Sequence, residues 1–454
     1  MNSQKKVGIE TRWILSLSIF AISLLYPVTM VYDSGHYLWL AKLINTGSWG
    51  EWDPFRGIIF PLLLVGFQKI FGWSMNGLLI PLSVSLVVLF LASSEVLRKV
   101  VVADTIHKKN WIYILIFVIV VLDPIVFGYY HLLLTEAVGS LLAIISILIA
   151  ITMYEKLTSS ELESGIIYMV ILGLLIVFSY HLKQPFITVA YTPFVVASFL
   201  IFITSQVKRS LIKTIIFGNI VIAIFLYITI AGWNSFLAFQ GVPTIPNRQV
   251  GTYLGNSIAS TVEGIKTSSI NFGGTLIERY LTIVNVYRRE ESSEFKQSIS
   301  FLSGFQNELL AYRSYNQYGN SNLFGLNYYE INGRSYNLLE YASIYEVLYL
   351  PPKWVNFAFV MREKLSNFLF SFGYLINPII FIALLVKFLR NKSHRYIVLL
   401  MLSATSLVNS ITHLFISPID RYLFPGYPLI LIILISLCWY AFENLKSVIK
   451  RFAR

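Results

Sequence analysis

The sequence is poor in cysteine and in charge. Its 454 residues include a single cysteine, Cys438, which lies inside an apolar run. One thiol excludes a disulfide framework within this chain and a metal site built from several cysteines. Only 13% of the residues are charged, whereas 56% are hydrophobic, and the mean hydropathy is +0.67. A soluble domain carries about 25% charged residues, so we expect most of the chain to lie in lipid.

Long apolar runs predict the membrane crossings. A bilayer core of about 30 Å requires about 17 to 25 helical residues. Ten runs meet this requirement: 13–31, 78–97, 111–128, 132–154, 165–180, 185–204, 212–231, 365–386, 396–416 and 422–442. The first run is followed by polar residues without a small-residue cleavage pattern, so we interpret it as an uncleaved span and not as a signal peptide. The expected fold is an all-α polytopic membrane protein with about ten transmembrane helices.

A further apolar run, 57–72, is short, contains Pro61 and carries Arg56 and Lys69 near its ends. We interpret it as an interfacial helix in the first outer loop. When it is left out of the count, most basic residues fall on one side of the membrane: Lys5, Lys6, Arg12, Arg98, Lys99, Lys108, Lys109, Lys156, Lys208, Arg209, Lys213, Lys387, Arg390, Lys392, Arg395, Lys446, Lys450, Arg451 and Arg454.

Lys and Arg collect in cytoplasmic loops, and this rule gives the topology a direction. We therefore predict that both termini are cytoplasmic and that the net charge of +12 reflects topology. Nucleic acid is not an expected partner. The short loops on the opposite side contain only Lys183 and Arg421, and the longer first loop adds Lys42, Arg56 and Lys69.

A segment of mixed polarity separates two groups of apolar runs. Residues 233–364 are rich in Tyr, Asn, Ser and Gly and are too many for a simple connection. We expect an outer subdomain of mixed, partly regular structure there. It would lie between an N-terminal membrane domain, 1–232, and a C-terminal part, 365–454, which comprises membrane helices and a basic cytoplasmic tail.

Ionisable side chains occur at span ends on the face predicted to be outside. Asp33 follows the first span, and Glu136 opens the fourth. His181 and Lys183 join the fifth and sixth spans, and Arg421 precedes the last. Two carboxylates suit the activation and orientation of a hydroxyl nucleophile, and cations suit the neutralisation of a phosphate leaving group. Transfer of a sugar from a lipid phosphate needs these parts.

Each of these residues also has a simpler structural interpretation. Asp33 can mark the exit of the chain from the membrane, and Glu136 can be an acid favoured by a helix dipole. Lys183 can extend toward lipid phosphates, and Arg421 can pair locally with its neighbour. Asp123, which precedes Pro124, is a further candidate acid, although satisfaction of a helix break is the favoured interpretation. An aromatic belt is the main interpretation of His36, Trp39, Trp49 and Trp52.

The order of these residues resembles the GT-C superfamily, and more closely its protein O-mannosyltransferase and lipid A aminoarabinose transferase branch. The resemblance depends on Asp33 with Tyr37 four residues later, on Thr135-Glu136, and on Arg421-Tyr422 with Pro425 nearby. It covers residues 13–204 and 365–442. It implies an inverting glycosyltransferase that uses a polyprenyl-phosphate donor, such as an undecaprenyl-phosphate sugar. The implied acceptor is a cell-surface glycan, a lipid-linked oligosaccharide, lipid A or a protein.

The resemblance also implies roles and a location. Asp33 would be the general base, Glu136 the second acid, and Arg421 a contact of the donor phosphate, with Lys183 and His181 beside it. Further pocket candidates are Tyr37, Arg56 and Tyr422. Glu136 has no adjoining acid, so no bound metal is predicted and dependence on a divalent cation is left open. The branch implies a bacterial inner membrane with the active site on the outer face.

Three other functions stay open from the sequence. A flippase or transporter of lipid-linked sugars would also place cations near lipid phosphates, although inverted repeats and broken helices are more typical of it. A polysaccharide polymerase or ligase would depend more on outer arginines, such as Arg279, Arg288 and Arg289. In a structural membrane protein, polar groups at span ends would serve only as interfacial anchors.

Overall fold

The computed structural model describes residues 2–24, 34–53, 56–72, 75–101, 106–131, 133–159, 161–204, 209–242, 330–331, 334–335, 353–416 and 420–452. Asp33 and most of 233–364 lie outside the described residues, so the predictions for them stay predictions. The long helices are α1 (Asn2–Leu24), α4 (Met75–Val101), α5 (Ile106–Leu122), α7 (Thr135–Thr158), α8 (Leu162–Leu182), α9 (Ile187–Thr204), α10 (Arg209–Phe239), α16 (Lys353–Arg390), α17 (His394–Ile416) and α18 (Tyr427–Phe452).

Shorter elements connect the long helices. They are α2 (Ser34–Thr46), α3 (Ile59–Phe71), α6 (Pro124–Tyr129) and the 3₁₀ helices η1 (Trp49–Glu51), η2 (Gln184–Phe186) and η4 (Asp420–Gly426). Two strands of two residues each, β1 (Glu330–Ile331) and β2 (Arg334–Ser335), pair antiparallel. The described chain is therefore helical apart from this one small hairpin.

Eight of the described helices are long and apolar enough to cross a membrane, namely α4, α7, α8, α9, α10, α16, α17 and α18. Helices α1 and α5, where two further crossings were predicted, contain shorter apolar stretches, Thr11–Leu24 and Asn110–Leu122. The chain is thus an integral membrane protein built from helices. The total of ten crossings stays a prediction.

Helix α7 forms the centre of the bundle. It packs against α4, α8, α9 and η4. Small residues allow this close packing: Ala137, Gly139, Ser140, Ala143, Ser146 and Ala150 are all buried. A Cβ atom at Gly139 would lie 2.7 Å from the ring of Phe186. The start of α7 and the 3₁₀ helix η2 are therefore in direct contact.

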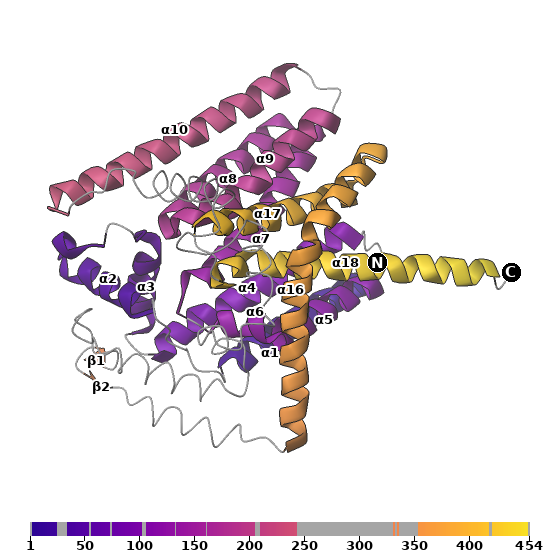
Figure 1. Ribbon diagram of the computed structural model, residues 1–454, viewed down its shortest axis with the longest axis horizontal. Helices are drawn as coiled ribbons and strands as arrows, with labels where there is room; N and C mark the ends of the chain where they lie inside the picture. Colours follow the sequence, from indigo (N-terminus) through magenta and orange to yellow (C-terminus); the bar gives the residue numbers. More distant parts are fainter. Residues whose placement is uncertain are drawn as a thin grey trace, which may run out of the picture.

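Helix α10 lies at the edge of the bundle (Figure 1). Only 6% of its most apolar stretch is buried, as expected for a helix that faces lipid on most sides. It packs on α8 at two glycines, because a Cβ atom at Gly173 would lie 2.9 Å from Ile222 and one at Gly218 would overlap Met169. Small residues at these positions let the two helices approach closely.

The short helices α2 and α3 pack against each other at one end of the molecule (Figure 1). The side-chain amide of Asn45 donates a hydrogen bond of 2.6 Å to Gln68 Oε1. Helix α3 has 13 residues, which span about 20 Å and are too few for a bilayer core. Its exposed face includes Leu62 and Ile70. An interfacial position of α3 stays a prediction.

The chain breaks between α5 and α6 at Asp123 and Pro124. Asp123 Oδ1 accepts hydrogen bonds from the backbone N–H groups of Ile125 at 2.9 Å and Val126 at 3.0 Å. The side chain thus caps α6, whose first residue is a proline that has no N–H to satisfy. The sequence-based interpretation that Asp123 satisfies a helix break is confirmed.

Candidate functional site

A buried ion pair joins the start of α7 to the end of α8. Lys183 Nζ lies 2.7 Å from Glu136 Oε1, and the side chains are only 12% and 1% exposed. Thr135 donates its hydroxyl to Glu136 Oε2 at 3.1 Å. A buried charge is tolerated when it is paired and hydrogen-bonded. The simpler interpretation that Lys183 extends toward lipid phosphates does not describe its position, because its ammonium is directed to Glu136.

Local sequence explains why these two side chains meet. Glu136 lies in the first turn of α7, where the helix dipole favours an acid. Lys183 ends α8 with an extended backbone (φ −162°, ψ 121°), and Pro185 follows it in η2. Lys183 thus leaves the helical conformation directly before Gln184-Pro185. This change of backbone direction turns its side chain toward α7. Its Nζ also lies 5.4 Å from the ring centroid of Phe186.

A second polar cluster lies in α2 and in the loop between α2 and α3. Arg56 Nη1 donates to the Tyr37 hydroxyl at 3.3 Å, and its guanidinium lies 5.4 Å from the Tyr37 ring centroid. Asp53 Oδ2 lies 3.1 Å from His36 Nε2 and 3.7 Å from Arg56 Nε. Two of the predicted pocket residues, Tyr37 and Arg56, are thus in contact. Sequence analysis did not select Asp53, which contacts both His36 and Arg56.

The loop between α2 and α3 reaches the end of α8 through Gly57. A Cβ atom at this position would overlap the backbone carbonyl of His181, so only glycine permits this approach. Arg56, which directly precedes Gly57, therefore lies close to the segment that contains His181 and Lys183. His181 is 8% exposed, and its Nε2 has no hydrogen-bond partner in the part of the chain that the structure describes.

Residues from the N-terminal part of the chain also contact the link between α6 and α7. Ser34, which follows Asp33 in sequence, is buried and donates its hydroxyl to the carbonyl of Leu133 at 3.0 Å. Ser23 Oγ lies 2.9 Å from His131 Nε2, and His131 Nδ1 lies 2.7 Å from the carbonyl oxygen of Phe127. Burial lowers the pKa of His131.

The segment η4, which contains Arg421 and Tyr422, packs against α7 and α17. The ring of Phe424 stacks on that of Tyr129 with centroids 4.1 Å apart and planes inclined by 11°. The carbonyl of Leu423 accepts a hydrogen bond from the Tyr374 hydroxyl. The backbone of η4 is described, whereas the side chains of Arg421 and Tyr422 lie outside the description.

Another set of contacts lies at the other end of α7 and of the helices that pack around it. Glu155 Oε1 lies 2.8 Å from Lys99 Nζ and 2.9 Å from His394 Nε2. The Tyr154 hydroxyl donates to Thr204 Oγ1 at 3.0 Å. In the described residues, each of these contacts joins helix ends that sequence analysis assigned to the same face. Figure 1 agrees, because α1 begins and α18 ends away from α2 and α3.

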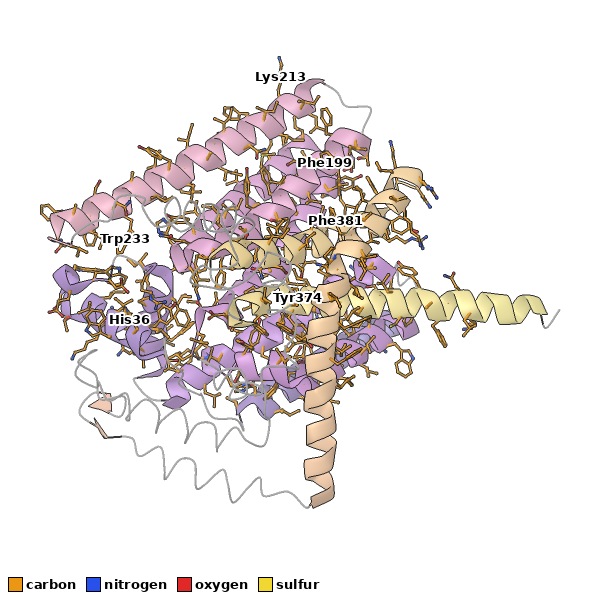
Figure 2. The ribbon with its side chains drawn as sticks, in the orientation of Figure 1. His36, Phe199, Lys213, Trp233, Tyr374 and Phe381 are labelled. Carbon is orange, nitrogen blue, oxygen red and sulfur yellow. The ribbon has the colours of Figure 1, made fainter. Side chains whose placement is uncertain are left out.

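Trp52, in the loop between α2 and α3, is packed more tightly than an aromatic belt requires. Trp52 is only 2% exposed and donates its indole N–H to the carbonyl of Arg56 at 3.2 Å. Its ring centroid lies 5.5 Å from that of Trp233, which α10 supplies. Figure 2 shows Trp233 on the same side of the molecule as His36. For Trp52, the belt interpretation was wrong, because this residue connects the loop to α10.

The arrangement combines a buried carboxylate, an ammonium and a guanidinium at one end of a membrane bundle. Such a set can hold an anionic group and keep water away from it. Within the described ranges, no group of three or more His, Cys, Asp or Glu residues is placed to hold a metal ion.

No protein-family model, curated protein or solved structure matches the chain.

Proposed function

We propose that the protein is an inverting glycosyltransferase that moves a sugar from a polyprenyl-phosphate donor to an extracytoplasmic acceptor. The Glu136–Lys183 pair carries this proposal, because it sets an ammonium and a carboxylate side by side in a largely water-excluded place at the end of the bundle. Arg56 and the segment η4 lie at the same end of the helices. An anionic lipid headgroup is the ligand that suits such a set.

In the proposed reaction, Asp33 is the general base. It accepts the proton of an acceptor hydroxyl while the hydroxyl oxygen attacks the anomeric carbon from the face opposite the phosphate. The bond between the anomeric carbon and the phosphate oxygen breaks, and the electron pair leaves with the polyprenyl phosphate. Arg421, Lys183 and His181 stabilise the charge of the leaving group, the kind of interaction that usually contributes most to catalysis.

Glu136 and the remaining pocket residues position the charged groups. Glu136 holds the Lys183 ammonium at 2.7 Å, so the lysine is oriented before the donor arrives. Tyr37 does the same for Arg56 through its hydroxyl at 3.3 Å. Tyr422 follows Arg421 and is proposed to line the same pocket. No metal is assigned a role, and dependence on a divalent cation can be measured with a chelator.

The two separate sets of contacts, one at each end of the bundle, support the proposed topology. Ten crossings place Asp33, Glu136, Lys183 and Arg421 on the outer face and both termini in the cytoplasm. Helix α3 lies at the interface, where its exposed apolar side chains are suited to contact the lipid tail of the donor. We propose a bacterial inner membrane as the location. The segment 233–364 is proposed to form the outer subdomain.

A transfer assay with the purified protein tests the proposal. The protein is incubated in detergent, without vesicles, with a labelled polyprenyl-phosphate sugar and an acceptor fraction. We expect label in the acceptor, and we expect Arg421→Ala to weaken donor binding and slow transfer. The matched control is Arg395→Ala, which removes an arginine near the opposite end of α17. Absence of transfer in detergent, together with donor movement between leaflets after reconstitution in vesicles, would instead indicate a flippase.

A further inference from the structure

Asp123 makes more hydrogen bonds than the cap of α6 requires. Its Oδ1 accepts from two backbone N–H groups, which completes the cap. Its Oδ2 accepts from the Tyr427 hydroxyl at 2.7 Å and from Ser366 Oγ at 3.1 Å. A carboxylate has about four acceptor positions, so each oxygen receives two donors. The side chain is only 6% exposed.

The two donors to Oδ2 come from distant parts of the chain. Ser366 is 243 residues away in α16, and Tyr427 is 304 residues away at the first position of α18. A hydrogen bond to a charged group is stronger than one between neutral groups. Asp123 therefore ties the break between α5 and α6 to the C-terminal helices.

Tyr427 directly follows η4, so its position sets where η4 ends. A second contact holds the middle of η4, where Phe424 stacks on Tyr129 of α6. The next residue, Tyr130, places its hydroxyl 2.7 Å from Ser140 Oγ on α7. Ser140 lies four residues after Glu136 and thus on the same side of α7. Helix α6 is therefore held between η4 and the part of α7 that begins with Glu136.

We propose that Asp123 is a positioning residue, which acts through the Tyr427 hydroxyl to fix η4, and with it Arg421, against the start of α7. This inference rests on the proposed function, in which Arg421 binds the donor phosphate. The role of Asp123 goes beyond a helix cap. The cap requires only Oδ1, whereas η4 depends on Oδ2.

Tyr427→Phe tests this role because it removes one hydroxyl and leaves the cap of α6 intact. The matched control is Tyr154→Phe, which removes a buried hydroxyl bonded to Thr204 at the other end of α7. We expect Tyr427→Phe to raise the KM for a polyprenyl-phosphate sugar about tenfold, the size of effect typical of a lost bond to a charged group. We expect kcat to be nearly unchanged, and both parameters to stay near wild type in the control.

A double-mutant cycle separates positioning from a merely structural role. If Tyr427 acts through Arg421, Tyr427→Phe should add nothing to the KM of an Arg421→Ala variant. An equal rise of KM in both backgrounds, or a rise no larger than that of the control, would overturn the inference. Asp123→Asn provides a further check, because its amide can still cap α6 and bond the Tyr427 oxygen. It should retain a lower KM than Asp123→Ala.

A label on η4 gives a readout that does not require activity. Cys438→Ser removes the native thiol, and Asp420→Cys then takes a spin label. We expect Tyr427→Phe to increase the mobility of this label, and Tyr154→Phe to leave it unchanged. Equal mobility in both variants would contradict the role of Asp123, whatever the reaction. If Arg421→Ala alone leaves donor binding unchanged, the proposed function fails and the label still decides whether Asp123 fixes η4.

Discussion

Replacing Lys183 by methionine tests the buried pair on which the candidate site depends. Methionine keeps much of the volume of lysine and removes its charge, so Glu136 would stay buried without its cation. The two side chains are 12% and 1% exposed and 2.7 Å apart. Removal of one partner from a buried pair costs about 3–5 kcal/mol. We expect Lys183→Met to lower the free energy of unfolding by about that amount.

The double variant Glu136→Gln/Lys183→Met should recover much of this loss, because it leaves no unpaired buried charge. A control pair is available at the opposite end of α7. Lys156 Nζ lies 2.6 Å from Glu161, but the side chains are 36% and 50% exposed. Removal of this exposed pair should have little effect on the free energy of unfolding.

Unfolding in mixed micelles, followed by circular dichroism against denaturant, is measured for the wild-type protein, Glu136→Gln, Lys183→Met and the double variant, and for the corresponding variants of Glu161 and Lys156. The coupling free energy between Glu136 and Lys183 is obtained from the cycle. We expect it to exceed that of the exposed pair by about 2 kcal/mol or more. Equal coupling in the two pairs would refute the conclusion that the Glu136–Lys183 pair is buried and mutually dependent.

Two further predictions concern the close approach of Gly57 to His181 and the side of the membrane on which the candidate site lies. Gly57→Ala should destabilise the protein by about 1–3 kcal/mol, because its Cβ would overlap the carbonyl of His181. Gly66→Ala, at a position with open space around it, should be neutral or stabilising in the same denaturant-unfolding assay. Single cysteines in a Cys438→Ser background should react with an impermeant reagent from one side only at positions 33 and 421, whereas positions 136 and 183 are too buried for such labelling. Labelling from both sides would contradict the proposed topology.

Much of the fold could be predicted from the sequence because hydropathy follows directly from composition. The apolar runs correspond to described helices, eight of which are long enough to span a membrane. The break at Asp123 was also predictable, since an acid before a proline is a local signal for a helix start. Whether α1 and α5 complete two further crossings depends on residues at their ends that the structure does not describe.

The candidate site could be predicted only in part. Sequence analysis selected Glu136 and Lys183 as separate residues on one face, but their contact depends on how α7 and α8 are rotated about their axes. No periodic pattern gives that rotation. Trp52 shows the same limit, because its burial depends on Trp233, far away in sequence. The two hydrogen bonds to Asp123 Oδ2 also come from distant helices, and no local motif indicates them.

The central claim is that Asp33 serves as the base in transfer of a sugar from a polyprenyl-phosphate donor. The most direct measurement compares the wild-type protein with Asp33→Asn for donor binding and for transfer of a labelled sugar to acceptor. We predict that the variant binds the donor and transfers no sugar. Full transfer by Asp33→Asn, or donor binding without transfer by the wild-type protein, would contradict the account.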